Sequence, residues 1–419
     1  MLKASALYIV IIIALVIGLI CSSLIVAAYF YKIQYQQKIR YDKLANNLSS
    51  GVNILLAGDD TAYNKGKTFS LFGGDADSIS IEKTTWGLYD VGIVKAFIQK
   101  DTLYKTFSIG YVLDSTKWAA LYLTDNDIPL SVSGKMLIKG NAYLPKAGIT
   151  QANIDGKEYQ GDKQMVIGHK YLSERTMPSL NKDRLQELLL LEQKHSGDTS
   201  LKTDSMKCSY LSAVHLFSLN KKKTVLNNVK LDGNIILISD TLLIIDSSAM
   251  LNNIIVYAKS IIVKNGFHGN CQLFASDSIH IESNCKFDYP SALGILRTNA
   301  SVAGTFPQIT IDSNINFKGI IFTYERNKSS IGATITIGKN VVITGQIYSQ
   351  SILKFTDSSV INGSVYTNSF VYKKNYKYYP NYLIDAQINV QSLSPYYLTS
   401  DLLPVAGKRK KILQWLEAN

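Results

Sequence analysis

The sequence predicts a mainly β protein with one long N-terminal helix, a small antiparallel sheet beside it, and a right-handed parallel β-helix (β-solenoid) with one inserted helix. Three observations support this class. Residues 4–31 carry no charged side chain, period-2 apolar runs follow, and an apolar-x-Gly pattern recurs every 18 to 20 residues or so. The expected parts are a transmembrane and protruding helix (1–57), the sheet (58–126), the solenoid (127–370, with a helix at about 179–195) and an aromatic and basic C-terminal wrap (371–419).

The apolar segment from Ala4 to Tyr31 is longer than the roughly 20 residues that a helix needs to cross a bilayer. Backbone groups in lipid must bond within the segment, which requires a helix. Tyr29 and Phe30 stand near its end, where an aromatic belt is expected. A cleaved signal peptide is the alternative, but signal cores span only about 7–15 residues. We therefore expect a single-pass anchor in contact with membrane lipid, with the helix continuing amphipathically to about residue 57.

The first residues resemble the N-terminus of type IV pilins and pseudopilins. Lys3, Ala4 and Ser5 precede a long aliphatic helix that becomes polar near Gln34. In that family a peptidase removes a short basic leader, which implies cleavage after Ala4 and a new N-terminus at Ser5. Ile9 replaces the family's usual Glu, as in some minor pseudopilins. The resemblance covers about 50 residues and implies an inner-membrane anchor with its body in the periplasm or at the cell surface.

The charges beside the anchor point to the other orientation. Only Lys3 precedes the apolar segment, whereas Lys32, Lys38, Arg40 and Lys43 follow it. The positive-inside rule alone would place the body in the cytoplasm. Both orientations stay open, and the pilin resemblance favours the extracytoplasmic one.

Four period-2 runs follow the helix: residues 78–84, 86–100, 101–113 and 118–124. The junction between Lys100 and Asp101 has the character of a hairpin turn. Four alternating runs after a long helix predict a small antiparallel sheet packed on that helix, which is also the order of elements in pilins.

From about residue 130 a repeat begins in which a short strand follows each apolar-x-Gly step. The predicted corner residues are Gly140, Gly233, Asn253, Gly269, Gly319, Gly345 and Gly363. Gly and Asn tolerate the positive φ that a tight corner requires. Gly345 and Gly363 stand 18 residues apart, a spacing typical of one solenoid coil. A β-sandwich with coincidental spacing is the alternative. Residues 179–194 read as a helix that covers one end or face of the stack.

No catalytic or metal-binding constellation is apparent, so we expect neither enzyme activity nor a cofactor. The acidic residues of the expected solenoid are scattered: Asp232, Asp240, Asp246, Asp277, Glu282, Asp288, Asp312, Glu325 and Asp357. The only paired carboxylates, Asp59 and Asp60, lie in a predicted loop outside the solenoid, where solvation of a corner is the favoured role. His268 and His280 are a weak metal or acid/base candidate if they meet on adjacent coils. Buried free thiols are favoured over a Cys271–Cys285 bridge.

The tyrosine-rich segment 372–382 allows two interpretations, sugar stacking or packing at the end of the solenoid, and packing is favoured. The net charge of +12 is spread along the chain without aromatic interleaving, so no nucleic-acid partner is expected.

Three functional hypotheses follow. The first is a membrane-anchored, non-enzymatic envelope protein with protein partners and possible self-association, such as a minor pseudopilin-like component of a pilus or secretion apparatus. Segments such as GNAYLPKAGI and YYPNYLIDAQIN also resemble an uncharacterised Bacteroidota envelope family. The second is a membrane-tethered, bactofilin-like polymer, and the third a carbohydrate-active β-helix protein.

Overall fold

The computed structural model describes residues 2–58, 60–73, 77–193, 201, 203–219, 224–298, 306–329, 331–374 and 377–418. The chain divides into two compact units, each considered by itself. The first comprises residues 1–83, 92–106 and 418–419, and the second residues 84–91 and 107–417. The protein is mainly β, with one long N-terminal helix, an antiparallel sheet and a large set of parallel strands.

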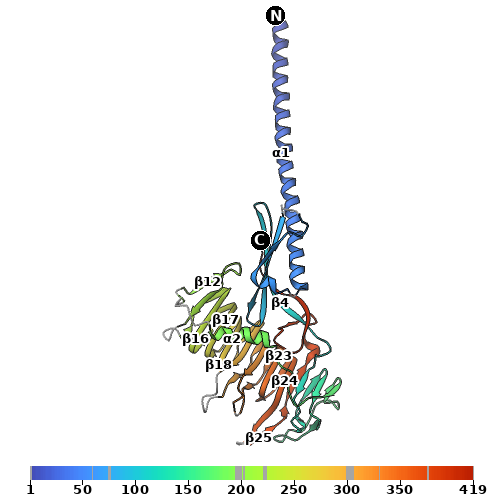
Figure 1. Cartoon of the computed structure of the whole chain (residues 1–419), viewed down its shortest axis with the longest axis vertical. Coiled ribbons are helices and arrows are strands. Elements are labelled where there is room, and N and C mark those ends of the chain that lie inside the picture. The colour runs from blue at the N-terminus through green and yellow to red at the C-terminus, as the bar shows by residue number, and fades with distance from the viewer. Residues whose placement is uncertain are drawn as a thin grey trace. The chain divides into compact units, whose positions relative to one another are not determined.

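Helix α1 (Leu2–Ala57) is one unbroken helix of 56 residues (Figure 1). Its first half presents large apolar side chains to the surroundings, among them Leu7, Ile13 and Ile20. Within the described residues it is the one helix long and apolar enough to cross a membrane. The expectation of one long N-terminal helix is therefore confirmed, and its continuity means that one element contains both the apolar segment and the residues that pack on the sheet.

The second half of α1 is amphipathic and packs on the sheet of its own unit. Leu44, Leu48, Val52 and Leu55 are buried on one face. Gly51 marks the closest approach, because a Cβ there would lie 2.6 Å from a methyl of Val94. The 3₁₀ helix η1 (Thr61–Lys65) follows α1 in the chain. After it come the strands β1 (Lys67–Phe69), β2 (Asp77–Trp86), β3 (Tyr89–Ile98) and β4 (Asp101–Leu113).

Polar contacts also hold α1 to the strands. The Asn47 amide donates to the buried carboxylate of Asp77 at 3.0 Å, and Lys43 Nζ lies 3.3 Å from the same carboxylate. These contacts hold the pKa of Asp77 below its usual value, with the Asn47 hydrogen bond as the largest cause. Arg40 reaches Asp101 at 3.2 Å.

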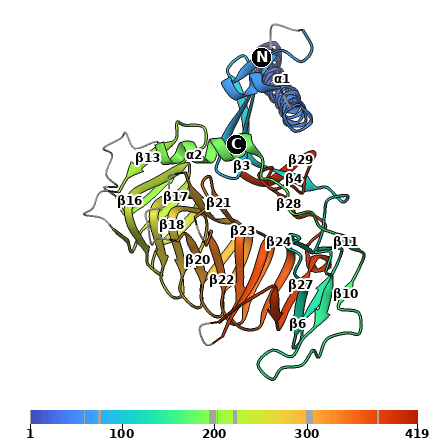
Figure 2. The ribbon, with the colours of Figure 1, turned by 60° about the horizontal axis from the view of Figure 1, so that its bottom comes forward.

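Nineteen strands of the second unit, together called the parallel stack, pair side by side in parallel (Figure 2). They are β5 (Leu121–Leu123), β7 (Leu137–Lys139), β8 (Ala142–Leu144), β10 (Val166–Ile167), β11 (Lys170–Leu172), β12 (Ser205–Cys208), β13 (His215–Ser218), β14 (Val225–Leu226), β15 (Lys230–Gly233), β16 (Ile235–Ile245), β17 (Met250–Val263), β18 (His268–Ile281), β19 (Lys286–Arg297), β20 (Gln308–Ile311), β21 (Asn316–Glu325), β22 (Thr334–Ile337), β23 (Val341–Phe355), β24 (Ser359–Lys374) and β27 (Ala386–Asn389).

The interior of the stack is an aliphatic ladder. Leu293, Ile321, Ile347 and Val365 stand in register on successive strands and are all fully buried. One strand cannot bury such a row alone, so neighbouring strands must lie side by side. This row belongs to one continuous apolar cluster that runs from residues near 120 to residues near 388.

The order of strands in the stack differs from their order in the chain. β24 pairs with β5 through Val365 and Leu121, and with β27 through Ser359 and Ala386. β5 then pairs with β8, and β8 with β11. The last long strand of the stack therefore pairs both with the first strand, β5, and with the last one, β27. The predicted run 118–124 thus belongs to the parallel stack rather than the antiparallel sheet.

The chain returns from β11 to β12 through the crossing segment 173–193, which contains α2 (Lys182–Gln193). Two more segments lie over the stack: the β2–β3 turn and residues 397–405. Gln272 on β18 accepts from Leu88 N–H at 2.8 Å and donates to the Trp86 carbonyl at 3.1 Å. We call segments 84–91, 173–193 and 397–405 the cover.

A buried arginine binds the three cover segments together. Arg184 on α2 is 4% exposed and lies 2.7 Å from both Asp90 and Asp401. It also donates to the Tyr89 carbonyl at 3.3 Å. Burial would lower the pKa of Arg184, but the two carboxylates outweigh it and hold the pKa well above its usual value. The Arg184 guanidinium therefore stays charged at any ordinary pH.

The remaining elements are short, apart from the last strand. They are β6 (Leu130–Ser133), β9 (Ile149–Gln151), β26 (Tyr382–Ile384), β25 (Lys377–Pro380), η2 (Val390–Ser392), β28 (Leu398–Thr399) and β29 (Ala406–Ala418). β28 pairs antiparallel with β4, and β29 also pairs β4. The basic run 408–411 of the expected C-terminal wrap therefore lies on a strand.

Six of the seven predicted corner residues have a positive φ; Gly269 does not. Gly319, Gly345 and Gly363 stack in register, and a Cβ on Gly345 would lie 1.9 Å from the Gly319 carbonyl oxygen. Glycine is needed there for close approach as well as for φ. At Gly269 only the close approach requires glycine, since a Cβ there would lie 2.7 Å from the Phe267 ring.

The sequence patterns missed one local detail. The run 86–100 is broken by a turn at Gly87 (φ 63°), so β2 ends and β3 begins within it. The helix expected at about 179–195 begins at Lys182, and the Asn181 side chain before it accepts from Asp183 N–H at 3.0 Å as its cap. Residues 194–195 lie outside the described residues.

Candidate ligand-binding site on the tyrosine ladder

A row of aromatic side chains runs along the outer surface of the parallel stack. Tyr366, Tyr122, Tyr143 and Tyr171 stand in register on β24, β5, β8 and β11. Their ring centroids are 5.6, 5.4 and 5.0 Å apart in that order, and each pair is stacked. We call these four residues the tyrosine ladder. Parallel in-register pairing places the rings at the strand spacing, which is close to stacking distance.

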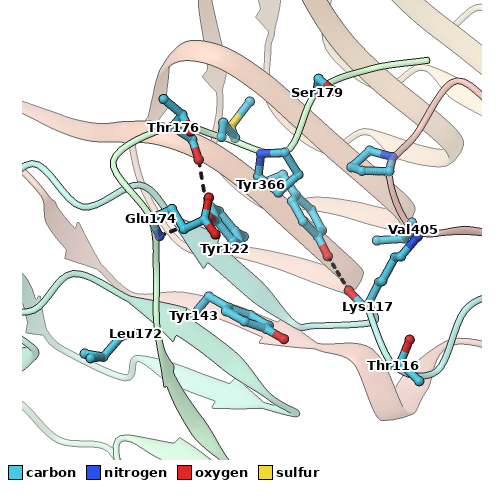
Figure 3. A pocket seen from close by; sticks show the side chains of 13 residues that line it. Thr116, Lys117, Tyr122, Tyr143, Leu172, Glu174, Thr176, Ser179, Tyr366 and Val405 are labelled. Carbon is cyan, nitrogen blue, oxygen red and sulfur yellow. Dashed lines mark hydrogen bonds between the residues drawn. The ribbon is translucent and has the colours of Figure 1, made fainter.

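Three members of the ladder, Tyr366, Tyr122 and Tyr143, line a pocket of about 670 Å³ beside the start of the crossing segment (Figure 3). Its lining residues are Thr116, Lys117, Tyr122, Tyr143, Leu172, Glu174, Thr176, Met177, Pro178, Ser179, Tyr366, Pro404 and Val405. Volumes of roughly 300–1,000 Å³ are typical of small-molecule sites, which also combine apolar walls with a few convergent polar groups. The pocket has both properties.

Two of the ladder hydroxyls are held by backbone groups. Tyr366 donates to the Lys117 carbonyl at 2.9 Å. Tyr122 accepts from Glu174 N–H at 3.1 Å and donates to the Thr176 carbonyl at 3.4 Å. Burial raises the pKa of both tyrosines above the ordinary value, so they remain protonated donors at neutral pH. The walls of the pocket are therefore fixed in place.

Other polar groups of the pocket are free to meet a ligand. Within the described part of the chain, the Tyr143 hydroxyl and the Glu174 carboxylate form no hydrogen bond or ion pair. The Glu174 side chain lies beside the Tyr122 ring (Figure 3). Lys117 Nζ lies 3.8 Å from Asp114 and is already partnered. The unpaired charge in the pocket is thus negative.

The fold does not bring together the two histidines that the sequence suggested as a metal or acid/base site. His268 and His280 lie near opposite ends of one strand, β18, rather than on adjacent coils. His268 contacts Asp288 at 2.5 Å, and His280 contacts Asp312 at 3.1 Å. Among the described residues, no group of three or more metal-ligating side chains is present.

The scattered carboxylates act locally. Asp60 caps η1 by accepting from Ala62 N–H at 2.8 Å, whereas Asp59 lies outside the described residues. Asp246 accepts from Ser248 N–H at 3.0 Å in a turn. Glu282 pairs with Lys264 at 2.6 Å. Cys208, Cys271 and Cys285 are buried free thiols, as favoured from the sequence.

The tyrosine-rich segment 372–382 is packed only in part. β24 pairs antiparallel with β25, and the half-buried rings of Tyr372, Tyr379 and Tyr382 lie against one another, whereas Tyr378 is 59% exposed. Lys354 and Lys373 lie 5.9 and 5.5 Å from the Tyr378 ring centre. The interpretation of packed aromatics is therefore wrong for Tyr378, whose partners are cations at the surface.

The proposed leader residues Ala4 and Ser5 lie in α1, outside the part whose side chains are described. Their cleavage stays a prediction. The tyrosine ladder, by contrast, was missed. Its signal is a repeated Tyr-Leu step, at Tyr122, Tyr143 and Tyr171, each followed by a polar residue or proline.

Comparison with known proteins gives little guidance. No family model and no curated protein matches the chain. Among solved structures it shows a likeness to the competence-associated pilin ComZ from Thermus thermophilus, at 9% identity and a TM-score of 0.26, over 85% of this chain and 87% of that one. A TM-score at this level carries no argument about fold or function.

Proposed function

We propose that the protein is a single-pass, membrane-anchored component of the cell envelope whose body lies outside the inner membrane. One observation carries this proposal: α1 changes character midway. Its first half exposes apolar side chains all round, as lipid requires, and its second half buries one face on an antiparallel sheet. This is the arrangement that the pilin and pseudopilin resemblance implies.

The parallel stack then serves as a rigid platform for partners. We interpret it as a β-solenoid, with right-handed coils as the usual hand. Fully buried aliphatic rows and stacked glycines support this interpretation. The role is structural or binding rather than enzymatic, and the partners are envelope proteins or other surface components.

A bactofilin-like polymer is the second candidate, and the ends of the stack weigh against it. The outermost strands are short: β10 has two residues, β11 three and β14 two, whereas β23 has fifteen. Short edge strands are a common means of preventing edge-to-edge association. End-to-end stacking would have to form over these small edges.

The mass of the purified full-length chain tests the pilin-like assignment. We expect a mature N-terminus at Ser5, and we expect Ala4→Trp to abolish that processing. Ala14→Trp, deeper in the exposed part of α1, is the matched control and should be processed normally. A chain that retains Met1 would remove the main support for this assignment.

Orientation is tested separately with reporters at the C-terminus. Alkaline phosphatase, which is active outside the cytoplasm, should be active in the fusion, and a fluorescent protein that folds only in the cytoplasm should stay dark. The opposite pattern would favour the cytoplasmic, bactofilin-like alternative.

A further inference from the structure

We propose that the pocket on the tyrosine ladder binds a neutral oligosaccharide. The pocket is wide enough for a short chain of sugars, at about 670 Å³, and combines aromatic walls with unpaired hydroxyl and carboxylate groups. This inference goes beyond the envelope role proposed above. It concerns a property of the purified protein and does not depend on the orientation of the anchor.

The aromatic walls are rigid before any ligand arrives. Tyr366 and Tyr122 are 4% and 6% exposed, and their hydroxyls are bonded to backbone groups of Lys117, Glu174 and Thr176. The accessible ring is that of Tyr143, which is only partly buried and is stacked on Tyr122; a tyrosine has only two side-chain torsions, so it offers contact area at a low entropic cost. Because the walls are already ordered, little of the binding free energy is lost in ordering them when a ligand binds.

The available polar groups suit a ligand rich in hydroxyls. The Tyr143 hydroxyl donates and accepts, and the free carboxylate of Glu174 accepts from up to two hydroxyls. Hydroxyls of Thr176 and Ser179 also line the pocket. A sugar presents many adjacent hydroxyls, each of which needs such a partner once it leaves water.

A peptide backbone would find fewer partners. The carbonyls of Lys117, Thr176 and Pro178 already accept from the hydroxyls of Tyr366, Tyr122 and Tyr348. Pro178 and Pro404 lack an N–H. The pocket therefore offers side chains rather than a free strand edge, and strand edges are what extended peptides use for main-chain pairing.

The charge in the pocket excludes acidic sugars. Glu174 is unpaired, whereas Lys117 lies beside Asp114. A uronic acid or a phosphorylated sugar would bring a second negative charge close to Glu174. The favoured ligand is thus uncharged.

The test is a titration of the full-length protein in a zwitterionic detergent. Glycoside detergents must be avoided because their sugar head groups would compete. Maltotriose, cellotriose, tri-N-acetylchitotriose and a trigalacturonic acid are titrated by calorimetry, with an extended, unstructured peptide as a further probe. We expect saturable binding of at least one neutral trisaccharide and none of the acidic one. Binding of the peptide or the acid alone, or of no probe at millimolar concentration, would overturn the proposal.

Two conservative variants locate the site without removing its walls. Tyr143→Phe keeps the ring but removes a neutral hydrogen-bonding group, and should lower the affinity for the neutral sugar about fivefold. Glu174→Gln removes a charged acceptor and should lower that affinity about tenfold. Tyr396→Phe and Glu158→Gln, outside the pocket, are the matched controls and should bind normally. Unchanged binding in both pocket variants would place the sugar elsewhere and overturn the assignment.

Discussion

The same outer row of the parallel stack is core in one stretch and binding surface in another. Phe274, Gly294, Phe322, Tyr348, Tyr366, Tyr122 and Tyr143 occupy equivalent positions on their strands. Phe274 and Phe322 are fully buried, whereas Tyr143 is only partly buried and Tyr171 is 44% exposed. The strands do not differ in register; what differs is the amount of chain lying over them.

Side-chain chemistry follows this change in cover. The two large, fully buried side chains, Phe274 and Phe322, are phenylalanines, which need no hydrogen-bond partner. Tyr348, Tyr366 and Tyr122 lie at the margin of the cover, and their hydroxyls reach backbone carbonyls. Tyr143 lies beyond it, and its hydroxyl is left for a ligand or water. The cover therefore decides which part of one repeated row stabilises the fold and which part can bind.

The largest expected effect is at the residue that holds the cover together. Arg184→Met leaves the carboxylates of Asp90 and Asp401 without their buried partner, and removing one member of a buried ionic group costs about 3–5 kcal/mol. The measurement is the free energy of unfolding in denaturant.

Arg175→Met is the matched control on the same crossing segment. Arg175 pairs with Asp127 at 3.0 Å, but the side chains are 77% and 66% exposed, so we expect a loss of less than about 1 kcal/mol. Equal losses for the two variants would mean that the buried cluster does not hold the cover.

A pair of truncations compares the two stretches of the row directly. Phe322→Ala empties a fully buried position and should cost about 3 kcal/mol, with an accompanying fall in the melting temperature. Tyr143→Ala removes a ring that is partly exposed, and should cost about 1 kcal/mol because less apolar area leaves a buried environment. Similar losses at both positions would show that the pocket stretch is as much core as the covered stretch.

The glycine ladder tests close approach against backbone conformation. Gly345→Ala places a Cβ against the Gly319 carbonyl and forces an L residue into positive φ. Gly148→Ala, at φ 77° with no atom near its Cβ, carries only the conformational cost of about 1–2 kcal/mol. We expect Gly345→Ala to be less stable than Gly148→Ala by a further ~2 kcal/mol, measured as unfolding midpoints. Equal midpoints would mean that the coils move apart at little cost.

Much of this fold is predictable from local chemistry. An uncharged apolar segment requires a helix in lipid, and recurring glycines with alternating aliphatic residues predict stacked strands. The joint between β24 and β5 is different. This pairing places Val365 beside Leu121. Any edge strand that carries an aliphatic row could pair with β24 in the same way, so the repeat alone does not predict that β5 is its partner.

The candidate site was hidden for a related reason. Tyr122, Tyr143 and Tyr171 are visible as a repeated Tyr-Leu step, yet period-2 alternation does not say what covers the outer face. Residues 174–179 make the pocket by running past these rings, and they follow no period. His268 and His280 fail for the opposite reason: the repeat suggests neighbouring coils, but one strand contains both.

The smallest expected effect concerns Asp385, which lies between β26 and β27. Its carboxylate accepts from Lys135 N–H at 2.8 Å and lies 2.6 Å from Lys157 Nζ. Burial would raise the pKa of Asp385, but these contacts outweigh burial and hold it below its usual value. A lowered folded-state pKa means that the stabilisation is present above the unfolded pKa, near 3.9, and is lost as the pH falls through the folded value.

Asp385→Asn should therefore cost about 1 kcal/mol or less at pH 7. Below about pH 4 the difference from the natural chain should shrink, because its carboxyl becomes neutral as well. Unfolding midpoints at pH 7, 5 and 3 give the measurement, and Asp127→Asn, whose exposed carboxylate faces Arg175, is the control with little change at any pH. A constant difference across this range would mean that Asp385 acts through the turn it caps rather than through its charge.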